Sequence, residues 1–496
     1  MYSSTQLPRA LYTAEQGRAL DVRAASVMRI EAFTLMERAG AVAFDLMTDR
    51  WPHLRRIIVI AGPGNNGGDA YVLARLARRN GIEVRLYALS DPSKLRGPAQ
   101  EAHRIYLAEE GQVRACTDEL PEADLIVDGL LGTGLDRPVE GAALNMIRLM
   151  ARHPAPVFAL DVPSGLAADT GTVLGEAVHA DCTITFIGMK RGLLTASGPE
   201  FCGELFFSDL GVPARAYEGE AAAAQRLDLA DLAALTPRAR DSHKGRNGHV
   251  LIVGGDHNMG GAVLMAGQAA LRCGAGLVTL ATRASHRGML LEQRPELMVV
   301  SVVDEEGLAP LVDRAQVIAL GPGLGRESWG EDLYEAALFA DLPTVLDADA
   351  LNLLAVAPRR RDDWILTPHP KEAARLLACD TAAVQADRYA AVRALQEEYG
   401  GVVVLKGAGT LIAGPDAATP ISVCPYGNPG MGSAGMGDVL TGVIAALLAQ
   451  FGDLGAAARL GVLAHAVAGD RAAASGGERG LIASDLMPEL RALVNP

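Results

Sequence analysis

RIIVIAGPGNNGGD, residues 56–69, is a short apolar run rich in β-branched side chains, followed at once by a glycine loop. A run of this length bounded by glycine is typical of a buried strand that enters a turn. Helical apolar spacing follows at residues 71–79. A strand, a glycine turn and a helix in this order are the repeating unit of a parallel sheet covered by helices, so this stretch predicts an α/β fold.

The same alternation continues along both halves of the chain. Between them lies YEGEAAAAQ, residues 217–225, which is small and acidic and has no periodic apolar face. We therefore predict two domains, residues 1–220 and 227–496, each built on a parallel sheet. The predicted strands are 56–61, 82–89, 125–128, 157–161 and 182–187 in the first half, and 249–253, 277–281, 317–320, 344–346, 364–367 and 402–405 in the second.

Composition excludes several classes of protein. A formal net charge of −14 over 496 residues disfavours nucleic acid and anionic membranes as partners, because both require a basic face. The six cysteines are scattered without CxxC spacing, which favours a reducing cytoplasm over a disulfide or zinc framework. No apolar run reaches the roughly 18 residues of a membrane span. We expect a cytoplasmic protein with small-molecule ligands.

The glycine loop of the first half has the features of an anion site. Glycines let the backbone approach a ligand, and the free N–H groups of a helix start attract phosphate. The loop also fits the GxGxxG pattern of a plain dinucleotide-binding domain. The ribose-binding acid of that fold would end the next strand, where Asp91 is a poor fit because it lies beyond the strand. The pattern alone therefore does not identify the ligand.

Two acidic residues follow other strands of the same half. Asp128 leads into GLLGTGLDRP, and Asp161 leads into VPSG. Either residue alone would more often be a turn former or a helix cap. Because the carboxyl ends of parallel strands share one edge of the sheet, we expect both to lie beside the glycine loop in one ligand site.

NNGGD, VDGLLGTGLDRP and DVPSG, in this order and spacing, resemble the NAD(P)H-hydrate epimerase family over residues 12–212. The resemblance implies that Asp161 is the acid/base and that Asn66, Asp128 and Ser164 hold a potassium ion, for which oxygen donors are suited. Ala70 departs from the glycine common in the family. The substrate-binding residues implied are Asn65, Asn66, Gly67, Gly68, Asp69, Gly132, Thr133, Gly134, Leu135, Asp136, Arg137 and Pro138.

The second half carries its own glycine loop, GNPGMGSAGMGD at residues 427–438, before an apolar helix predicted at 439–448. Such a loop makes an anion hole, and Asp438 either caps the helix or takes a proton from a hydroxyl that attacks phosphate. No Walker motif occurs. Four upstream segments also follow strands, and their shared position favours one site: GPGLG (321–325), DADALN (347–352), TPHPKE (367–372) and KGAGT (406–410).

These segments resemble the ribokinase-like fold and, more narrowly, ADP/ATP-dependent NAD(P)H-hydrate dehydratases, over residues 243–494. Lys371 departs from the family's usual glycine, and Gly432 with Ala434 inverts a small-residue pattern. The resemblance implies that the hydrate is bound by Ala262, Gly323, His369 and Asp438, with Asp438 catalytic. It implies that the adenine nucleotide is bound by Lys406, Gly407, Ala408, Gly409, Thr410, Gly435 and Gly437.

The two resemblances together imply a Rossmann-like domain followed by a ribokinase-like domain, in an enzyme that repairs hydrated NADH and NADPH (NADHX and NADPHX). The first domain would interconvert the R and S epimers, and the second would dehydrate the S epimer with ADP or ATP. K⁺ and Mg²⁺ are the expected ions, and a homo-oligomer is the expected assembly. Two alternatives are a small-molecule hydroxyl kinase with an accessory N-terminal module, and a first half that only binds or scaffolds.

Overall fold

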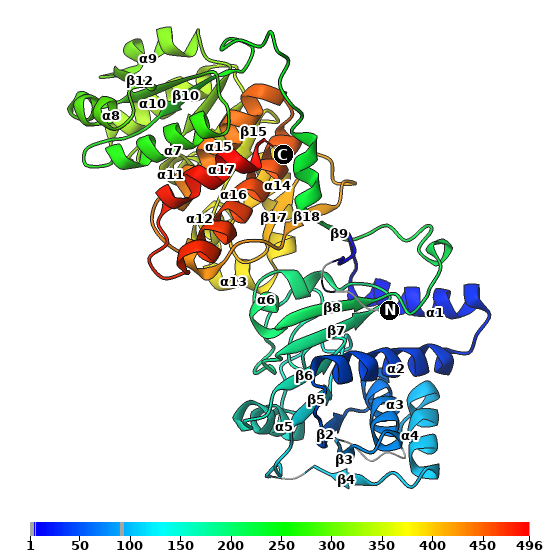
Figure 1. The fold of residues 1–496 in the computed structure, drawn as a ribbon. Helices are drawn as coiled ribbons and strands as arrows, with labels where there is room; N and C mark the ends of the chain where they lie inside the picture. Colours follow the sequence, from blue (N-terminus) through cyan, green and yellow to red (C-terminus); the bar gives the residue numbers. More distant parts are fainter. Residues whose placement is uncertain (1–3, 5, 90–93, 117, 496) are drawn as a thin grey trace. The chain divides into compact units, whose positions relative to one another are not determined.

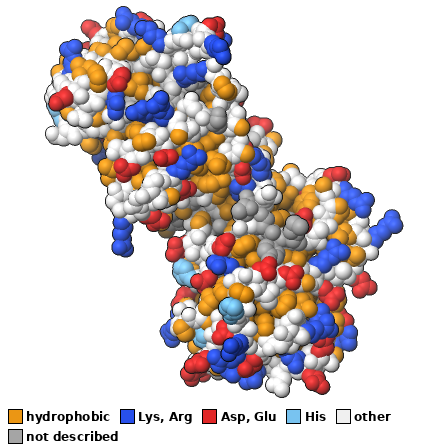
Figure 2. Space-filling view, viewed as in Figure 1, with side chains coloured by type: hydrophobic (Ala, Val, Ile, Leu, Met, Phe, Trp, Pro, Cys, Tyr) orange, Lys and Arg blue, Asp and Glu red, His pale blue; other side chains and the backbone are white. Residues whose placement is uncertain are grey.

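The computed structural model describes residues 4, 6–89, 94–116 and 118–495, so Asp91 lies outside the described residues. The chain divides into two compact units, Met1–Gln225 and Arg226–Pro496, and each is described by itself. Among the described residues, no helix combines the length and the apolar character needed to cross a membrane. Figure 2 shows acidic and basic side chains interspersed over the visible face of each unit.

The first unit is built on a parallel sheet with the strand order β4-β3-β2-β5-β6-β7-β8 (Figure 1). Its strands are β2 (Arg56–Ala61), β3 (Glu83–Ala88), β4 (Val113–Ala115), β5 (Leu125–Gly129), β6 (Val157–Leu160), β7 (Cys182–Phe186) and β8 (Glu204–Ser208). Its helices are α1 (Ala14–Met28), α2 (Ala32–Arg50), α3 (Asn65–Arg79), α4 (Gly97–Ala108), α5 (Gly141–Arg152) and α6 (Gly198–Phe201). A short β1 (Ala10–Leu11) pairs with β9 (Ala224–Arg226), which spans the boundary between the units.

Both faces of this sheet are apolar, which is why β2 reads as a continuous hydrophobic run. Ile57 and Val59 face a core shared with α2, α3 and α4, whereas Ile58 and Ile60 face a core shared with α5. Successive side chains of a strand point to opposite faces, so a strand covered on both sides needs apolar residues at every position.

The predicted strands of the first half are present, with two differences. β4 and β8 at the sheet edges were not predicted. In addition, α3 begins at Asn65, not at residue 71, so NNGGD forms helical turns instead of an open loop. Gly68 lets α3 pack closely against α2, because a methyl group at that position would collide with Met36 of α2. The glycines serve close helix packing as well as ligand approach.

The second unit has its own sheet in the order β18-β17-β16-β15-β14-β13-β10-β11-β12. Its strands are β10 (His249–Val253), β11 (Leu277–Thr282), β12 (Met298–Ser301), β13 (Val317–Leu320), β14 (Thr344–Leu346), β15 (Trp364–Leu366), β16 (Val402–Leu405), β17 (Thr410–Ala413) and β18 (Ile421–Cys424). Its longer helices are α7 (Gly260–Arg272), α8 (Arg287–Gln293), α9 (Glu305–Val312), α10 (Ser328–Phe339), α11 (Ala348–Val356), α12 (Pro370–Leu376), α13 (Thr381–Ala386), α14 (Arg388–Tyr399), α15 (Met436–Phe451), α16 (Leu454–Gly476) and α17 (Leu486–Leu493).

The second sheet is antiparallel at one edge. β16, β17 and β18 pair antiparallel, and neither β17 nor β18 was predicted. KGAGT is therefore mostly a hairpin turn, and its Thr410 is the first residue of β17. The turn residues stay at the carboxyl end of β16, where the sequence placed them.

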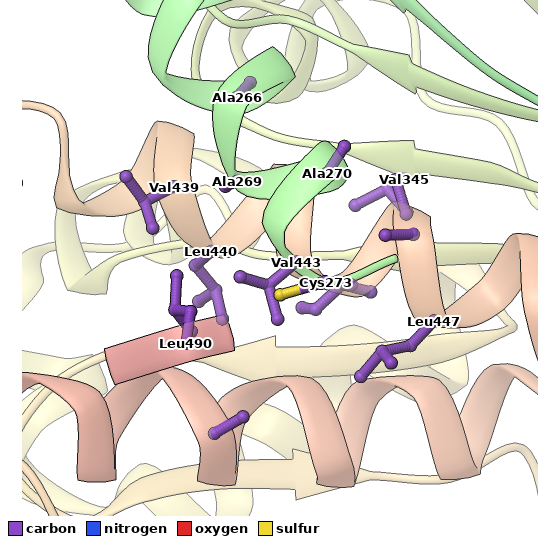
Figure 3. Close-up of a cluster of buried hydrophobic side chains, with 14 of the residues drawn as sticks. Ala266, Ala269, Ala270, Cys273, Val345, Val439, Leu440, Val443, Leu447 and Leu490 are labelled. Atoms are coloured by element: carbon purple, nitrogen blue, oxygen red, sulfur yellow. The ribbon is translucent and has the colours of Figure 1, made fainter. Parts of the chain in front are cut away.

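The core of the second unit fixes the helix that carries Asp438. Figure 3 shows Ala266, Ala269 and Ala270 of α7 together with Val439 and Val443 of α15 in one apolar cluster. The two helices approach closely, because a methyl group at Gly442 of α15 would collide with the backbone carbonyl of Ala266. α15 starts at Met436, three residues before the predicted start at 439, which places Asp438 in its first turn.

Candidate active sites

In the first unit, the loops that follow β2 and β5 lie against each other. The amide of Gly62 donates to the carbonyl of Gly129 at 3.0 Å. A methyl group at Gly132 would lie 3.2 Å from Cβ of Asn66. The structure thus brings the NNGGD segment and the start of GTGLDRP together at the carboxyl edge of the sheet, as the sequence predicted. Further along this loop, Gly134, Asp136, Arg137 and Pro138 are exposed, as is Asn65 at the start of α3.

A buried hydrogen-bond network joins the three residues proposed to hold potassium. Ser164 donates to Asp128 through its hydroxyl (2.6 Å to Oδ1) and its amide (2.8 Å to Oδ2). Burial raises the pKa of Asp128, and these hydrogen bonds oppose the effect. Asn66 donates from Nδ2 to the carbonyl of Leu131 at 2.7 Å, while its buried Oδ1 has no hydrogen-bond partner. A buried oxygen in that state is costly unless something binds it.

Asp161 lies directly after β6 with a backbone φ of 63°, a left-handed conformation that non-glycine residues rarely adopt. Its Oδ1 accepts a hydrogen bond from Nζ of Lys190 at 2.5 Å and another from Oγ1 of Thr185 at 2.9 Å. The acid/base candidate is therefore paired with a buried lysine from the segment after β7. The sequence reasoning missed Lys190 and Thr185, although Thr185 lies in a predicted strand and Lys190 closely follows it.

Two more carboxyl groups are electrostatically coupled to Asp161. Burial raises the pKa of Asp69 well above its ordinary value, with further raising by Asp161 and Asp21 and opposition from Lys190. The surrounding protein raises the pKa of Asp21 to about 6, although part of that side chain contacts solvent; Lys190 lowers this pKa and Asp161 adds to it. Asp69 was predicted from NNGGD. Asp21 was missed because α1 carries no motif.

In the second unit, a buried ion pair lies where β14, β15 and β16 end side by side in the sheet. Nζ of Lys406 lies 2.6 Å from Oδ1 of Asp347 and 3.9 Å from a carboxyl oxygen of Glu372. Thr441 of α15 donates to the other oxygen of Asp347 at 2.9 Å. Burial tends to raise the pKa of Asp347, but Lys406 and the hydrogen bonds outweigh it, so this pKa is lowered.

The first turn of α15 lies against this pair. A methyl group at Gly437 would be 3.4 Å from both Oδ2 of Asp347 and Nζ of Lys406, so glycine leaves space above the charges. Burial, together with Asp347, raises the pKa of Asp438 to about 7, with Lys406 opposing. Burial likewise raises the pKa of Glu372 to about 7, again opposed by Lys406. Asp438 and Glu372 thus both have a pKa of about 7, and both are coupled to Lys406.

His369 has a structural role in addition to its predicted binding role. It precedes α12, and its Nδ1 accepts hydrogen bonds from the amides of Lys371 (3.1 Å) and Glu372 (3.3 Å). Glu372 in turn accepts from the amide of His369 at 2.8 Å, which completes a capping box. Burial, and then Lys406, lowers the pKa of His369. The ring therefore caps the helix in its neutral form, and Lys371 beside it is exposed.

The remaining hydrate-binding candidates also meet. A methyl group at Gly323 would lie 3.3 Å from Cβ of Ala262, and φ at Gly323 is 58°. The amide of Gly325 donates to Asp349 at 3.0 Å, and the amide of Asp256 donates to the carbonyl of Gly323 at 2.7 Å. The loops after β10, β13 and β14 are thereby fastened to one another. Asp256 was not predicted.

The nucleotide candidates lie on two segments. In the hairpin turn, Thr410 donates from its hydroxyl to the carbonyl of Gly407 at 3.0 Å. Arg388 supports the same turn by donating to the carbonyls of Leu405 (3.2 Å) and Lys406 (3.3 Å). On the other segment, Gly435 caps α15 with a φ of 90°, while Gly432 and Ala434 of the same loop are exposed.

Comparison with known proteins matches each half to a family. Residues 32–192 match the model described as "YjeF-related protein N-terminus", and residues 250–491 match the model described as "NAD(P)H-hydrate dehydratase". A bifunctional NAD(P)H-hydrate repair enzyme from Coxiella burnetii is 48% identical over 98% of this chain and 99% of that protein. The chain belongs to the bifunctional NAD(P)H-hydrate repair enzyme family. The Escherichia coli repair enzyme is 43% identical over 99% of this chain and 95% of that protein.

The fold class predicted for this repair-enzyme chain is confirmed: a Rossmann-like parallel-sheet unit is followed by a ribokinase-like unit. A solved structure of a hypothetical protein from Streptococcus mutans is 29% identical and covers 54% of this chain and 98% of its own, with a TM-score of 0.50. The family membership and the two matching models together leave the hydroxyl-kinase alternative without support.

Proposed function

We propose that this chain interconverts the R and S epimers of NADHX and NADPHX in its first unit and dehydrates the S epimer in its second unit, using ADP or ATP. Besides the family, one observation carries the proposal. Each unit holds a carboxyl group at the carboxyl edge of its sheet, coupled to a lysine: Asp161 with the buried Lys190, and Asp438 with the partly buried Lys406. Two such sites in one chain suit two successive proton-transfer reactions.

In the first unit, Asp161 is the group that takes and returns a proton. The hydrated ring carries its hydroxyl on a carbon beside the ring nitrogen, and inversion requires that a bond to this carbon break and re-form on the other face. A carboxylate that accepts the hydroxyl proton and later gives it back supports both directions. The first turn of α3, with its free amides, receives the phosphates of the dinucleotide.

Potassium fits the pocket formed by Asn66, Asp128 and Ser164. The support is the unpartnered buried Oδ1 of Asn66, which lies in a network of oxygen atoms and matches the donor preference of a hard cation. The ion would hold the two loops in the geometry that binds substrate. Replacing K⁺ by Na⁺ is expected to weaken hydrate binding to the first unit, measured by titration, and to leave nucleotide binding to the second unit unchanged. Equal affinity in both salts would remove the ion from this role.

In the second unit, Asp438 accepts the hydroxyl proton while the hydroxyl oxygen attacks the terminal phosphoryl group of the nucleotide. The phosphate ester that forms then loses inorganic phosphate from the hydroxyl-bearing carbon and a proton from the adjacent ring carbon, which restores the double bond. Phosphate is a better leaving group than hydroxide. Phosphorylation by the nucleotide therefore makes possible an elimination that direct loss of hydroxide would not allow. The free amides at the start of α15, next to Gly435 and Gly437, stabilise the transferred charge.

Mg²⁺ fits this site as a companion of the nucleotide rather than as a resident ion. Among the described residues, no three His, Cys, Asp or Glu side chains converge as a metal cage. Mg²⁺ usually keeps several waters and binds through substrate phosphates and one or two carboxylates. When bound, it would neutralise charge on the phosphates. A homo-oligomer and a cytoplasmic location stay predictions.

The test supplies a mixture of R and S hydrates with ADP or ATP and follows the recovery of reduced-nicotinamide absorbance. Wild-type protein is expected to recover all of it, releasing inorganic phosphate in equal amount. Asp161→Ala is expected to recover only the S fraction quickly, with R-to-S conversion slowed on the order of 10²–10⁴-fold. A stable phosphorylated product without recovered absorbance would show a hydroxyl kinase instead.

A further inference from the structure

We infer that Lys190 is a positioning residue of the first site, which fixes the Asp161 carboxylate and balances its charge among neighbouring carboxyl groups. This inference rests on the proposed epimerase activity and deepens it by naming a residue outside the motifs.

The ammonium group of Lys190 makes three hydrogen bonds within the protein. Its Nζ donates to Oδ1 of Asp161 at 2.5 Å, to Oγ1 of Thr185 at 3.2 Å and to the carbonyl of Phe186 at 3.2 Å. An ammonium has three N–H donors, so its bonding capacity is used. Lys190 is only 5% exposed. The group therefore acts on a substrate through Asp161 and not by direct contact.

The N-terminal segment holds the lysine in place. The amide of Tyr12 donates to the carbonyl of Met189 at 2.8 Å, and the amide of Arg191 donates to the carbonyl of Tyr12 at 3.0 Å. These bonds clamp the backbone on both sides of Lys190. A methyl group at Gly17 of α1 would lie 3.7 Å from Cε of Lys190. The segment precedes residue 32, where the match to the family model begins.

The surrounding charges explain why a cation is needed at this position. Besides Lys190, the charged groups coupled to this site are Asp69 from α3 and Asp21 from α1, with Arg18 acting on Asp21. The pKa of Asp69 is raised well above its ordinary value by burial, and that of Asp21 is raised to about 6. The direct ion pair places the Lys190 ammonium on the Asp161 carboxylate, where it offsets the repulsion between these acidic groups.

The backbone supports the same assignment. Asp161 has a left-handed φ of 63°, and its amide donates to the carbonyl of Ile184 at 2.7 Å. A strained residue persists only where its surroundings determine its conformation. The hydrogen bonds from Lys190 and Thr185 hold the carboxyl group of Asp161 in its observed orientation. Removing the ammonium leaves the Asp161 carboxylate with only the Thr185 hydrogen bond to hold its orientation.

The experiment measures R-to-S conversion by the full chain, comparing Lys190→Met with Lys94→Met. Lys94 is the other lysine of the first unit and is exposed. Lys190→Met is expected to lower kcat about 10²-fold or more while KM changes by only a few-fold, because substrate contacts stay in place. Lys94→Met is expected to match wild type, and dehydration of S hydrate in the same variant is the internal control.

Thr185→Val and Lys190→Arg keep the test decisive if Lys190→Met fails to fold. Thr185→Val removes the hydrogen bonds that Thr185 makes with Asp161 and Lys190 but keeps the cation, so it is expected to lower kcat less than tenfold. Lys190→Arg keeps the charge and is expected to regain a large part of the kcat that Lys190→Met loses. A near-normal kcat in Lys190→Met, or a kcat in Lys190→Arg as low as in Lys190→Met, would overturn the inference. Wild-type protein that does not epimerise would refute the proposed function instead.

Discussion

Asp438 is the residue on which the second reaction depends most directly. It lies in the first turn of α15 beside Gly437, while Gly435 is the N-cap residue, and it is placed to accept a proton. Asp438→Asn keeps the volume of the side chain and removes the base. We expect adenine nucleotide binding to persist and hydrate-dependent phosphate release to fall by roughly 10²-fold or more. Nucleotide titration and a phosphate assay measure the two effects; loss of both together would identify a structural cap.

The pKa of Asp438 also predicts the pH dependence of the wild-type reaction. Burial raises this pKa to about 7, and only the ionised form can accept the hydroxyl proton. Dehydration of the S epimer should therefore slow as pH falls through about 7, and the steady-state rate between about pH 5.5 and 8.5 measures it. In Asp438→Asn this inflection should disappear from the residual rate. If it persists unchanged, another group with a similar pKa is the base, and Glu372 is the first candidate.

At the scale of elements, the packing of α15 in the core of the second unit should be separable from the chemistry at the start of α15. Leu447 is buried in the cluster of Figure 3, nine residues after Asp438. Leu447→Ala is expected to cost about 2–5 kcal/mol in the free energy of unfolding of the second unit, because it leaves a cavity. Denaturant titration measures this loss. Phe451→Ala, at an exposed position of the same helix, is the matched control and should cost much less.

The elements that the sequence predicted well are those whose burial is uniform. β13 is apolar throughout, and β2 and β10 are apolar after their first residues, Arg56 and His249, because helices cover both faces. These strands could therefore be predicted from composition alone. β17 and β18 form an antiparallel edge next to glycine and proline turns, and their short runs resemble loops. Asp161 directly follows β6, and Asp438 lies in the first turn of α15. Both were predicted because these elements have clear apolar patterns in the sequence. Lys190 and Asp21 join the site through tertiary packing, which no local pattern records.

At the scale of the whole molecule, each unit has its own sheet and its own core. We predict that cutting the chain between Gly219 and Leu227 yields two fragments that fold separately, since few contacts define a domain boundary. The first fragment should epimerise hydrates, and the second should dehydrate the S epimer. Circular dichroism, cooperative unfolding and the two assays check this. Two insoluble fragments would show that the units depend on each other for stability.

The cap of α12 makes one region of the enzyme vulnerable during acidic purification or storage. The ring of His369 can accept its two backbone hydrogen bonds only while Nδ1 carries no proton. Its pKa is lowered by burial, so the contribution of the neutral ring to stability is present at neutral pH and is lost as pH falls below the unfolded value of about 6.5. Protonation would then release the start of α12 and, with it, the Glu372 carboxyl beside Lys406. Acidified preparations should lose dehydration before they lose overall structure, and neutral buffer should restore it.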